Sequence, residues 1–214
     1  MTAPLTGQAP PGRETPPARE VLVPVGPLIS QIPGPDDGFP SPDLAEHWRP
    51  RGCGIACLRM ILSSYRIDHG SYWSLISEGL QTGAYCDRGW IHQGLLDMAT
   101  RHGLPGTAHR NRTTTHLRDD LLAGHLLIAS VTVCFRGGQP RSDATNQVHT
   151  PGGHLVVVTG TRLDNTGGPT EFRVHHPSAT PTNNLSNHWV THERFTASFS
   201  GNYLTFPDPG AARP

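Results

Sequence analysis

A cysteine between two glycines is the strongest chemical signal in the sequence. Cys53 lies in the segment RGCGIACLRMIL, where an apolar pattern of helical period begins. The N-terminus of a helix carries partial positive charge and free N–H groups, which lower the pKa of a thiol and stabilise its thiolate. The flanking Gly52 and Gly54 would let a substrate backbone approach closely. We therefore interpret Cys53 as a candidate nucleophile, against the ordinary alternative of a small buried hydrophobic residue.

The other three cysteines fit that ordinary alternative. Cys57 lies one helical turn beyond Cys53, and Cys86 and Cys134 stand in no comparable setting. Four cysteines in 214 residues do not indicate a disulfide framework. A zinc site built on Cys53 and Cys57 is a weaker hypothesis, because the sequence contains no CxxC pair.

A cysteine nucleophile needs a base, and His154 stands out among the 13 histidines. It follows the turn TPGG and opens the β-branched run LVVVTG. This pattern predicts a histidine at the start of a strand, held by the sheet and reachable from solvent. The alternative is a polar residue that only marks the strand start.

The elements that must position these two residues change in type along the chain. Apolar residues at intervals of three and four predict helices over residues 54–65, 90–102 and 114–123, the last with Thr114 as N-cap. Short β-branched or aromatic runs predict strands over residues 126–135, 154–161, 171–175 and 202–206. Helices followed by strands of this kind are typical of an α+β fold with an antiparallel sheet.

Proline-rich ends flank one predicted domain. Residues 1–20 and 209–214 are predicted to be disordered, and residues 21–208 to form the domain. Within it, residues 21–32 predict an extended segment at a sheet edge or along the surface, and residues 34–50 predict a loop.

The composition excludes several classes of function. The 17 basic residues balance 17 acidic ones, so no nucleic-acid partner is expected. All 17 are arginines, which excludes a Schiff-base lysine and a P-loop. The N-terminus has no apolar signal segment, and the longest apolar run, residues 126–135, is too short for a membrane span. We expect a cytoplasmic protein.

Three segments together resemble the catalytic blocks of a known family. GCGIACLRMIL, GGHLVVVTG and VHHPSA are similar to the blocks of the bacteriocin-processing, double-glycine leader peptidases, a branch of the papain-like cysteine peptidases. The resemblance covers most of residues 21–206. It implies a papain-like fold, in which an N-terminal helical part with the nucleophile helix packs on a C-terminal antiparallel sheet. It also implies a peptide or amide substrate, and neither metal nor organic cofactor.

The resemblance assigns roles to individual residues. Cys53 matches the nucleophile and His154 the general base and acid. His176, before Pro177, stands where the family has the Asp that orients the histidine. A neutral His176 could still fix the tautomer by accepting a hydrogen bond. His175 is the alternative if the strand register differs by one.

An oxyanion-hole donor is expected upstream of the cysteine. Gln31 matches the family's glutamine block, and His47, six positions before Cys53, is the alternative.

The function predicted from these residues is a cysteine peptidase-like hydrolase working through a thioester, with precursor peptides as one substrate class. Two alternatives use the same scaffold. One is an acyl or amide transferase, and the other is a catalytically degenerate relative that only binds peptides.

Overall fold

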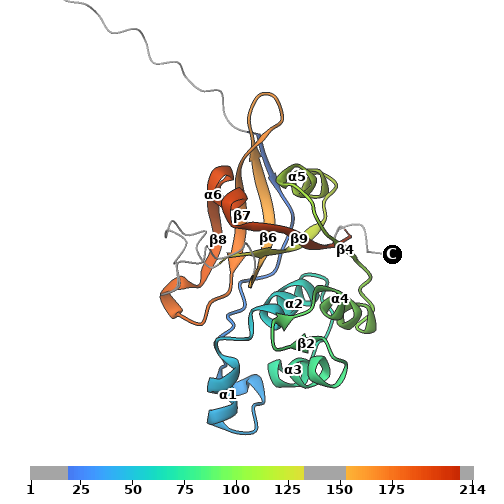
Figure 1. Cartoon of the computed structure of the whole chain (residues 1–214), viewed down its shortest axis with the longest axis vertical. Coiled ribbons are helices and arrows are strands. Elements are labelled where there is room, and N and C mark those ends of the chain that lie inside the picture. Colours follow the sequence, from blue (N-terminus) through green and yellow to red (C-terminus); the bar gives the residue numbers. More distant parts are fainter. Residues whose placement is uncertain (1–18, 133–152, 208–214) are drawn as a thin grey trace, which may run out of the picture.

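The structure is a computed structural model and describes residues 19–132 and 153–207. A helical part and a sheet part lie against each other (Figure 1). The helical part contains α1 (Pro42–Trp48), α2 (Cys53–Ser64), α3 (Tyr72–Gln81) and α4 (His92–Arg101), with the 3-10 helix η1 (Pro35–Asp37) and the hairpin β2 (Tyr85–Cys86) and β3 (Gly89–Trp90).

The sheet part has seven strands, and every pairing in it is antiparallel. Its order is β4 (Thr107–His109), β9 (Phe199–Phe206), β5 (Leu126–Val131), β6 (His154–Leu163), β7 (Pro169–His176) and β8 (Leu185–Thr191), and β1 (Arg19–Leu22) also pairs with β6.

Strand β6 lies at the centre of this sheet. Along one edge it pairs first with β5, from Val131 opposite His154, and then with β1, from Leu22 opposite Gly160. Strand β7 occupies its other edge. A strand buried on both faces requires a nearly continuous apolar and β-branched run, which explains the sequence LVVVTG.

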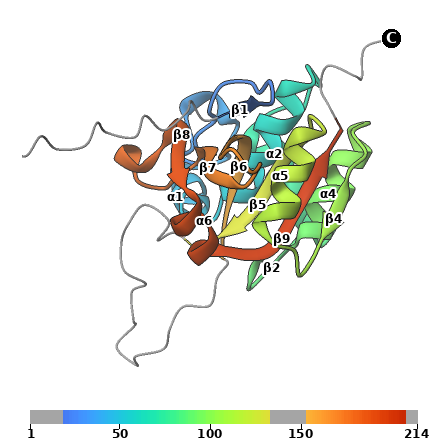
Figure 2. The same cartoon turned by 90° about the horizontal axis from the view of Figure 1, so that it is seen from above.

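Helices cover the sheet on both sides. Helix α5 (Thr114–Leu122) packs on β5 and β6, and α6 (His192–Ser198) packs on β7 and β8, as Figure 2 shows from above. Helix α2 contacts β6 from the helical part, and its side chains Ile55, Leu58, Ile61 and Leu62 are fully buried. A 3-10 helix, η3 (Pro181–Asn183), lies between β7 and β8.

The predicted α+β class is confirmed: the helix that begins at Cys53 packs on a C-terminal antiparallel sheet. The three predicted helices correspond to α2, α4 and α5, and the four predicted strands to β5, β6, β7 and β9. The buried side chain of Cys57 also confirms its ordinary interpretation. Within the described ranges, no helix is both long and apolar enough to cross a membrane.

Several boundaries were predicted wrongly. Trp90 belongs to β3 and not to the helix, because it pairs with Tyr85 and the helix begins only at His92. Thr113 is the N-cap of α5, since the Thr114 hydroxyl turns inward to His192 Nε2 at 2.8 Å.

The expected loop over residues 34–50 contains η1 and α1. Ser41 caps α1 by accepting a hydrogen bond from the Leu44 backbone N–H at 3.2 Å, a local signal stronger than the prolines around it. Helix α3 was not predicted.

Residues 19 and 20, expected in the disordered tail, begin β1, because backbone pairing with β6 holds a segment that buries little apolar surface. Cys134, Gly152 and the predicted tails over 1–18 and 209–214 lie outside the described residues.

Candidate active site

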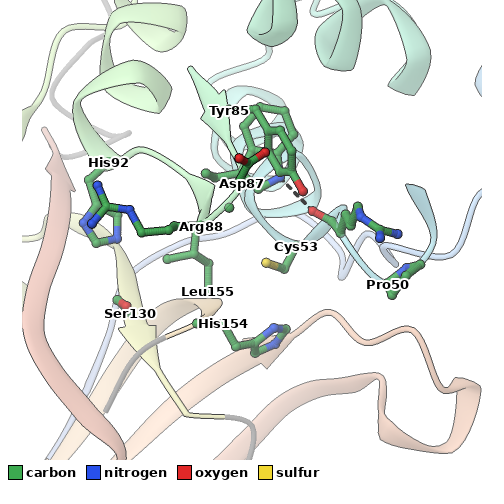
Figure 3. Close-up of a pocket in the computed structure, with 13 residues that line it drawn as sticks. Pro50, Cys53, Tyr85, Asp87, Arg88, His92, Ser130, His154 and Leu155 are labelled. Carbon is green, nitrogen blue, oxygen red and sulfur yellow. Dashed lines mark hydrogen bonds between the residues drawn. The ribbon is translucent and has the colours of Figure 1, made fainter. Parts of the chain in front are cut away.

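Cys53 is the first residue of α2, and its side chain faces a cavity of about 550 Å³. The cavity lies between the helical part and the sheet, and His154 faces it from the first position of β6 (Figure 3). The fold therefore brings together the two residues that the sequence predicted as nucleophile and base.

A backbone interaction links the Cys53 sulfur to the strand that carries His154. The thiol interacts with the backbone N–H of Leu155, the residue that follows His154. It also interacts with the N–H groups of Gly54 and of Cys53 itself. Three N–H groups around one sulfur are a setting that stabilises negative charge on it.

The imidazole of His154 is oriented by a backbone carbonyl. A ring N–H donates to the Pro177 carbonyl, and Nε2 is buried with no hydrogen-bond partner among the described residues. Nδ1 is therefore the donor, and a neutral ring presents Nε2 as the free base. This arrangement suits a general base whose acceptor atom must stay available to the thiol.

His176 packs against His154 from the last position of β7. The two ring centroids are 4.7 Å apart and the rings are inclined by 59°. His176 Nδ1 donates to the Asn183 carbonyl at 2.6 Å, so Nε2 is unprotonated in the neutral ring. His176 thus lies where the resemblance places the orienting residue, while the Pro177 carbonyl makes the orienting bond to Nδ1.

His175 faces the other side of β7. Its Nε2 donates to the Gly26 carbonyl at 3.2 Å, and its Nδ1 accepts from the Asn187 N–H at 3.1 Å. Adjacent strand residues point to opposite faces, so only one of the two histidines can reach His154. The register of β7 therefore places His176, and not His175, beside His154.

Burial determines the protonation state of the pair. Desolvation raises the pKa of Cys53 above its ordinary value of 9.0, although the three N–H groups lower it in part. Desolvation and the nearby His176 lower the pKa of His154 to about 3, while the Pro177 carbonyl raises it in part. The expectation of a lowered cysteine pKa was wrong, because desolvation of the partly buried Cys53 outweighs the partial charge of the helix N-terminus.

The two upstream candidates for the oxyanion hole do not line the cavity. Gln31 is buried behind the nucleophile turn, and its Nε2 donates to the Arg49 carbonyl at 2.8 Å. His47 is exposed on α1 and its ring contacts Trp48. Gln31 remains a predicted oxyanion-hole donor, and this role requires its side-chain amide to break the hydrogen bond with the Arg49 carbonyl.

The walls of the cavity come from residues that the sequence did not single out clearly. Tyr85 and Trp90 of the β2–β3 hairpin form an aromatic wall, and the Trp90 indole Nε1 donates to the Arg51 carbonyl at 2.7 Å. Arg88, at the hairpin tip, extends toward the end of the cavity where His92 lies (Figure 3). The hairpin that carries these residues was not predicted, because each of its strands is only two residues long.

Comparison with known proteins identifies the fold. No protein-family model matches the sequence, and no curated protein matches it. A double glycine motif protease from an AMS/PCAT transporter, solved in complex with the leader peptide, is similar in structure with a TM-score of 0.52 and 17% identity, covering 87% of this chain and 94% of that one.

Two further solved structures agree. The peptidase domain of Streptococcus ComA matches with a TM-score of 0.51 and 19% identity, over 73% of this chain and 92% of that one. A putative C39-like peptidase from Bacillus anthracis matches with a TM-score of 0.56 and 16% identity, over 88% and 97%. The chain therefore has the fold of the double-glycine, C39-like peptidases, as the sequence resemblance predicted.

Proposed function

We propose that the chain is a cysteine peptidase that cleaves a peptide or amide bond, with Cys53 as nucleophile and His154 as general base and acid. One observation carries the proposal. Two residues 101 positions apart in the sequence face one cavity, and the backbone N–H next to the histidine acts on the thiol electrostatically.

The neutral resting pair determines the first step. His154 Nε2 takes the thiol proton as the sulfur attacks the substrate carbonyl, because a separate thiolate–imidazolium pair is disfavoured in this buried site. The carbonyl π electrons move to oxygen, and the resulting oxyanion needs N–H donors. The imidazolium then protonates the departing amine, and a thioester to Cys53 remains.

Water completes the cycle. His154, neutral again, removes a proton from a water molecule that attacks the thioester, and Cys53 leaves as a thiol. The products are an acid, an amine and the original enzyme, so no cofactor is consumed. The Pro177 carbonyl holds the imidazole in one tautomer through both half-reactions.

Precursor peptides are the proposed substrate class. One of the structural neighbours is described as a double glycine motif protease in complex with the leader peptide, and this chain covers 94% of that neighbour. The proposal transfers this substrate class to the present chain on the basis of a shared fold and a shared pair of residues.

The test is cleavage of a mixed peptide library, with products identified by mass spectrometry. We expect wild-type turnover to be lost in Cys53→Ala and in His154→Ala, with folding intact by circular dichroism. Cys86→Ala is the matched control, because this partly buried thiol lies in the hairpin and does not line the cavity. Turnover that survives in Cys53→Ala would overturn the proposal. Adding an amine acceptor separates hydrolysis from acyl transfer.

A second candidate is supported by the electrostatics. A peptide-binding relative without turnover needs neither a reactive thiolate nor an orienting carboxylate. Burial raises the pKa of Cys53 and lowers that of His154, and position 176 carries no carboxylate. Peptide binding in wild type without product formation in the library assay would favour it.

A further inference from the structure

A buried hydroxyl lies directly behind the nucleophile turn. Tyr72, on α3, is fully buried, and its Oη is 3.0 Å from the Gln31 carbonyl and 3.1 Å from the Gly52 carbonyl. A tyrosine has a single O–H hydrogen, so this hydrogen is shared between the two oxygens. Gly52 is the residue immediately before Cys53.

The absence of a side chain at position 52 permits this contact. A Cβ atom built on Gly52 would overlap the Tyr72 hydroxyl and lie 2.9 Å from its ring carbon Cζ. Its backbone has φ −82°, which any residue can adopt, so the glycine is required for space and not for conformation. The position of the Tyr72 hydroxyl therefore depends on there being no side chain at position 52.

The Gly52 carbonyl has two hydrogen-bonding contacts. It accepts the first helical bond from the Ala56 N–H at 2.9 Å, and it receives the Tyr72 hydroxyl on its other side. Rotation of the Gly52–Cys53 peptide plane would disturb both contacts. Because a trans peptide is planar, fixing this carbonyl also fixes the Cys53 N–H in the opposite direction.

That N–H points to the reacting side of the turn. As the first helical residue, Cys53 has no helical acceptor for its N–H, and the N–H interacts with its own thiol. The oxyanion of a tetrahedral intermediate would form beside the attacking sulfur, which is where this N–H donor lies.

We propose that Tyr72 is a positioning residue, whose hydroxyl fixes the Gly52–Cys53 peptide so that the Cys53 N–H serves the oxyanion hole. The inference rests on the proposed function and adds to it a residue in α3 that does not line the cavity. Burial raises the pKa of Tyr72, so the hydroxyl remains a donor throughout the working pH range.

Two reactions at the same sulfur separate positioning from general damage. In addition to an aldehyde, His154 takes the thiol proton, an S–C bond forms and the carbonyl electron pair moves to oxygen, which then needs the N–H donor. Alkylation by iodoacetamide forms an S–C bond and expels iodide, and no oxyanion forms. Loss of the donor should therefore weaken the first reaction and spare the second.

The experiment uses the full chain and N-acetyl-glycyl-glycinal, which has no side chain to clash with the aromatic wall. Its dissociation constant is measured by protection of Cys53 against iodoacetamide. Removing one shared hydrogen bond in Tyr72→Phe should weaken aldehyde binding by about three- to tenfold, with the alkylation rate of free protein within about twofold of wild type. Tyr203→Phe is the matched control, because its buried hydroxyl bonds Asp120 and does not line the cavity.

Equal aldehyde affinity in Tyr72→Phe and wild type would overturn the inference. A wild-type Cys53 that binds no aldehyde would overturn the proposed function and this inference with it, so the two failures are distinguishable. If Tyr72→Phe does not fold, the inference is tested on the wild type, by following the NMR signal of the Cys53 amide proton. Its NMR resonance should move downfield when the aldehyde binds, and an unchanged resonance would refute the role of this N–H.

Discussion

Replacing His176 by Asp should make Cys53 more reactive at neutral pH. In the wild type the pKa of Cys53 lies above 9.0 and that of His154 is about 3. At about 1.4 kcal/mol per pKa unit, the lowered pKa of His154 alone adds about 5 kcal/mol to the cost of moving the proton from thiol to imidazole, and the raised pKa of Cys53 adds to it. The same transfer between two ordinary side chains costs roughly 3 kcal/mol.

A carboxylate in place of the His176 ring would act on the more perturbed member of the pair. The two histidine rings are 4.7 Å apart, and a carboxylate within about 4–6 Å of an imidazole raises its pKa by roughly 1–3. The cost of proton transfer would fall by about 1.4–4 kcal/mol. We therefore expect Cys53 to be alkylated at least about tenfold faster between pH 6 and 8.

The assay is iodoacetamide alkylation across pH 4 to 9, read for each cysteine by mass spectrometry. Cys57 is fully buried and serves as an internal reference for global opening. His176→Asn is the matched control, because it has the shape of Asp without the charge. His176→Glu tests whether the shorter Asp side chain fails to reach His154. Equal alkylation rates in the Asp, Glu and Asn variants, all folded, would refute the electrostatic reasoning.

Three further predictions test the charge and packing of the site. The pKa of His154 is about 3 in the folded protein and 6.5 in the unfolded chain, so the unfolded state binds more protons between these values. Lowering the pH from 6.5 to 4.5 should therefore reduce the free energy of unfolding by about 2 kcal/mol through this residue. Urea titrations that show the same pH slope in His154→Asn would contradict this. Arg88 lines the cavity, so Arg88→Gln should slow the reaction of Cys53 with anionic iodoacetate by about two- to fivefold relative to its reaction with neutral iodoacetamide. The control is Arg66→Gln, at an exposed position beyond the far end of α2, which should leave the ratio of the two rates unchanged. Gly54→Ala should lower the free energy of unfolding by about 1–3 kcal/mol, since the new Cβ would lie 2.5 Å from Trp90 Cγ, and an unchanged melting temperature would count against this packing.

The sequence by itself determined the type of most elements and singled out Cys53 and His154 as the candidate reacting pair. The apolar period after Cys53 predicts a helix, and that helix buries Ile55 and Leu58. The flanking glycines were expected to admit a substrate backbone, but Gly52 and Gly54 are buried against Tyr72 and Trp90. The run after His154 can only be satisfied by a strand covered on both faces, as β6 is. These are local patterns, so they can be read without knowing what they pack against.

Tertiary structure decided the electrostatics and the choice between neighbouring candidates. A helix N-terminus lowers a thiol pKa when it is open to water, but Cys53 is partly buried against the core and desolvation reverses the direction. The choice of His176 over His175 depends on strand register, which is set by pairing across the sheet.

The contacts that hold the nucleophile turn also come from distant segments. Tyr72 and Trp90 reach the Gly52 and Arg51 carbonyls from α3 and β3, and nothing in their local sequence marks them. Hydrogen bonds across such sequence separations exist only once the helical part has packed. The sequence therefore identified which residues could react, and the packed fold determined their protonation states and what holds them in place.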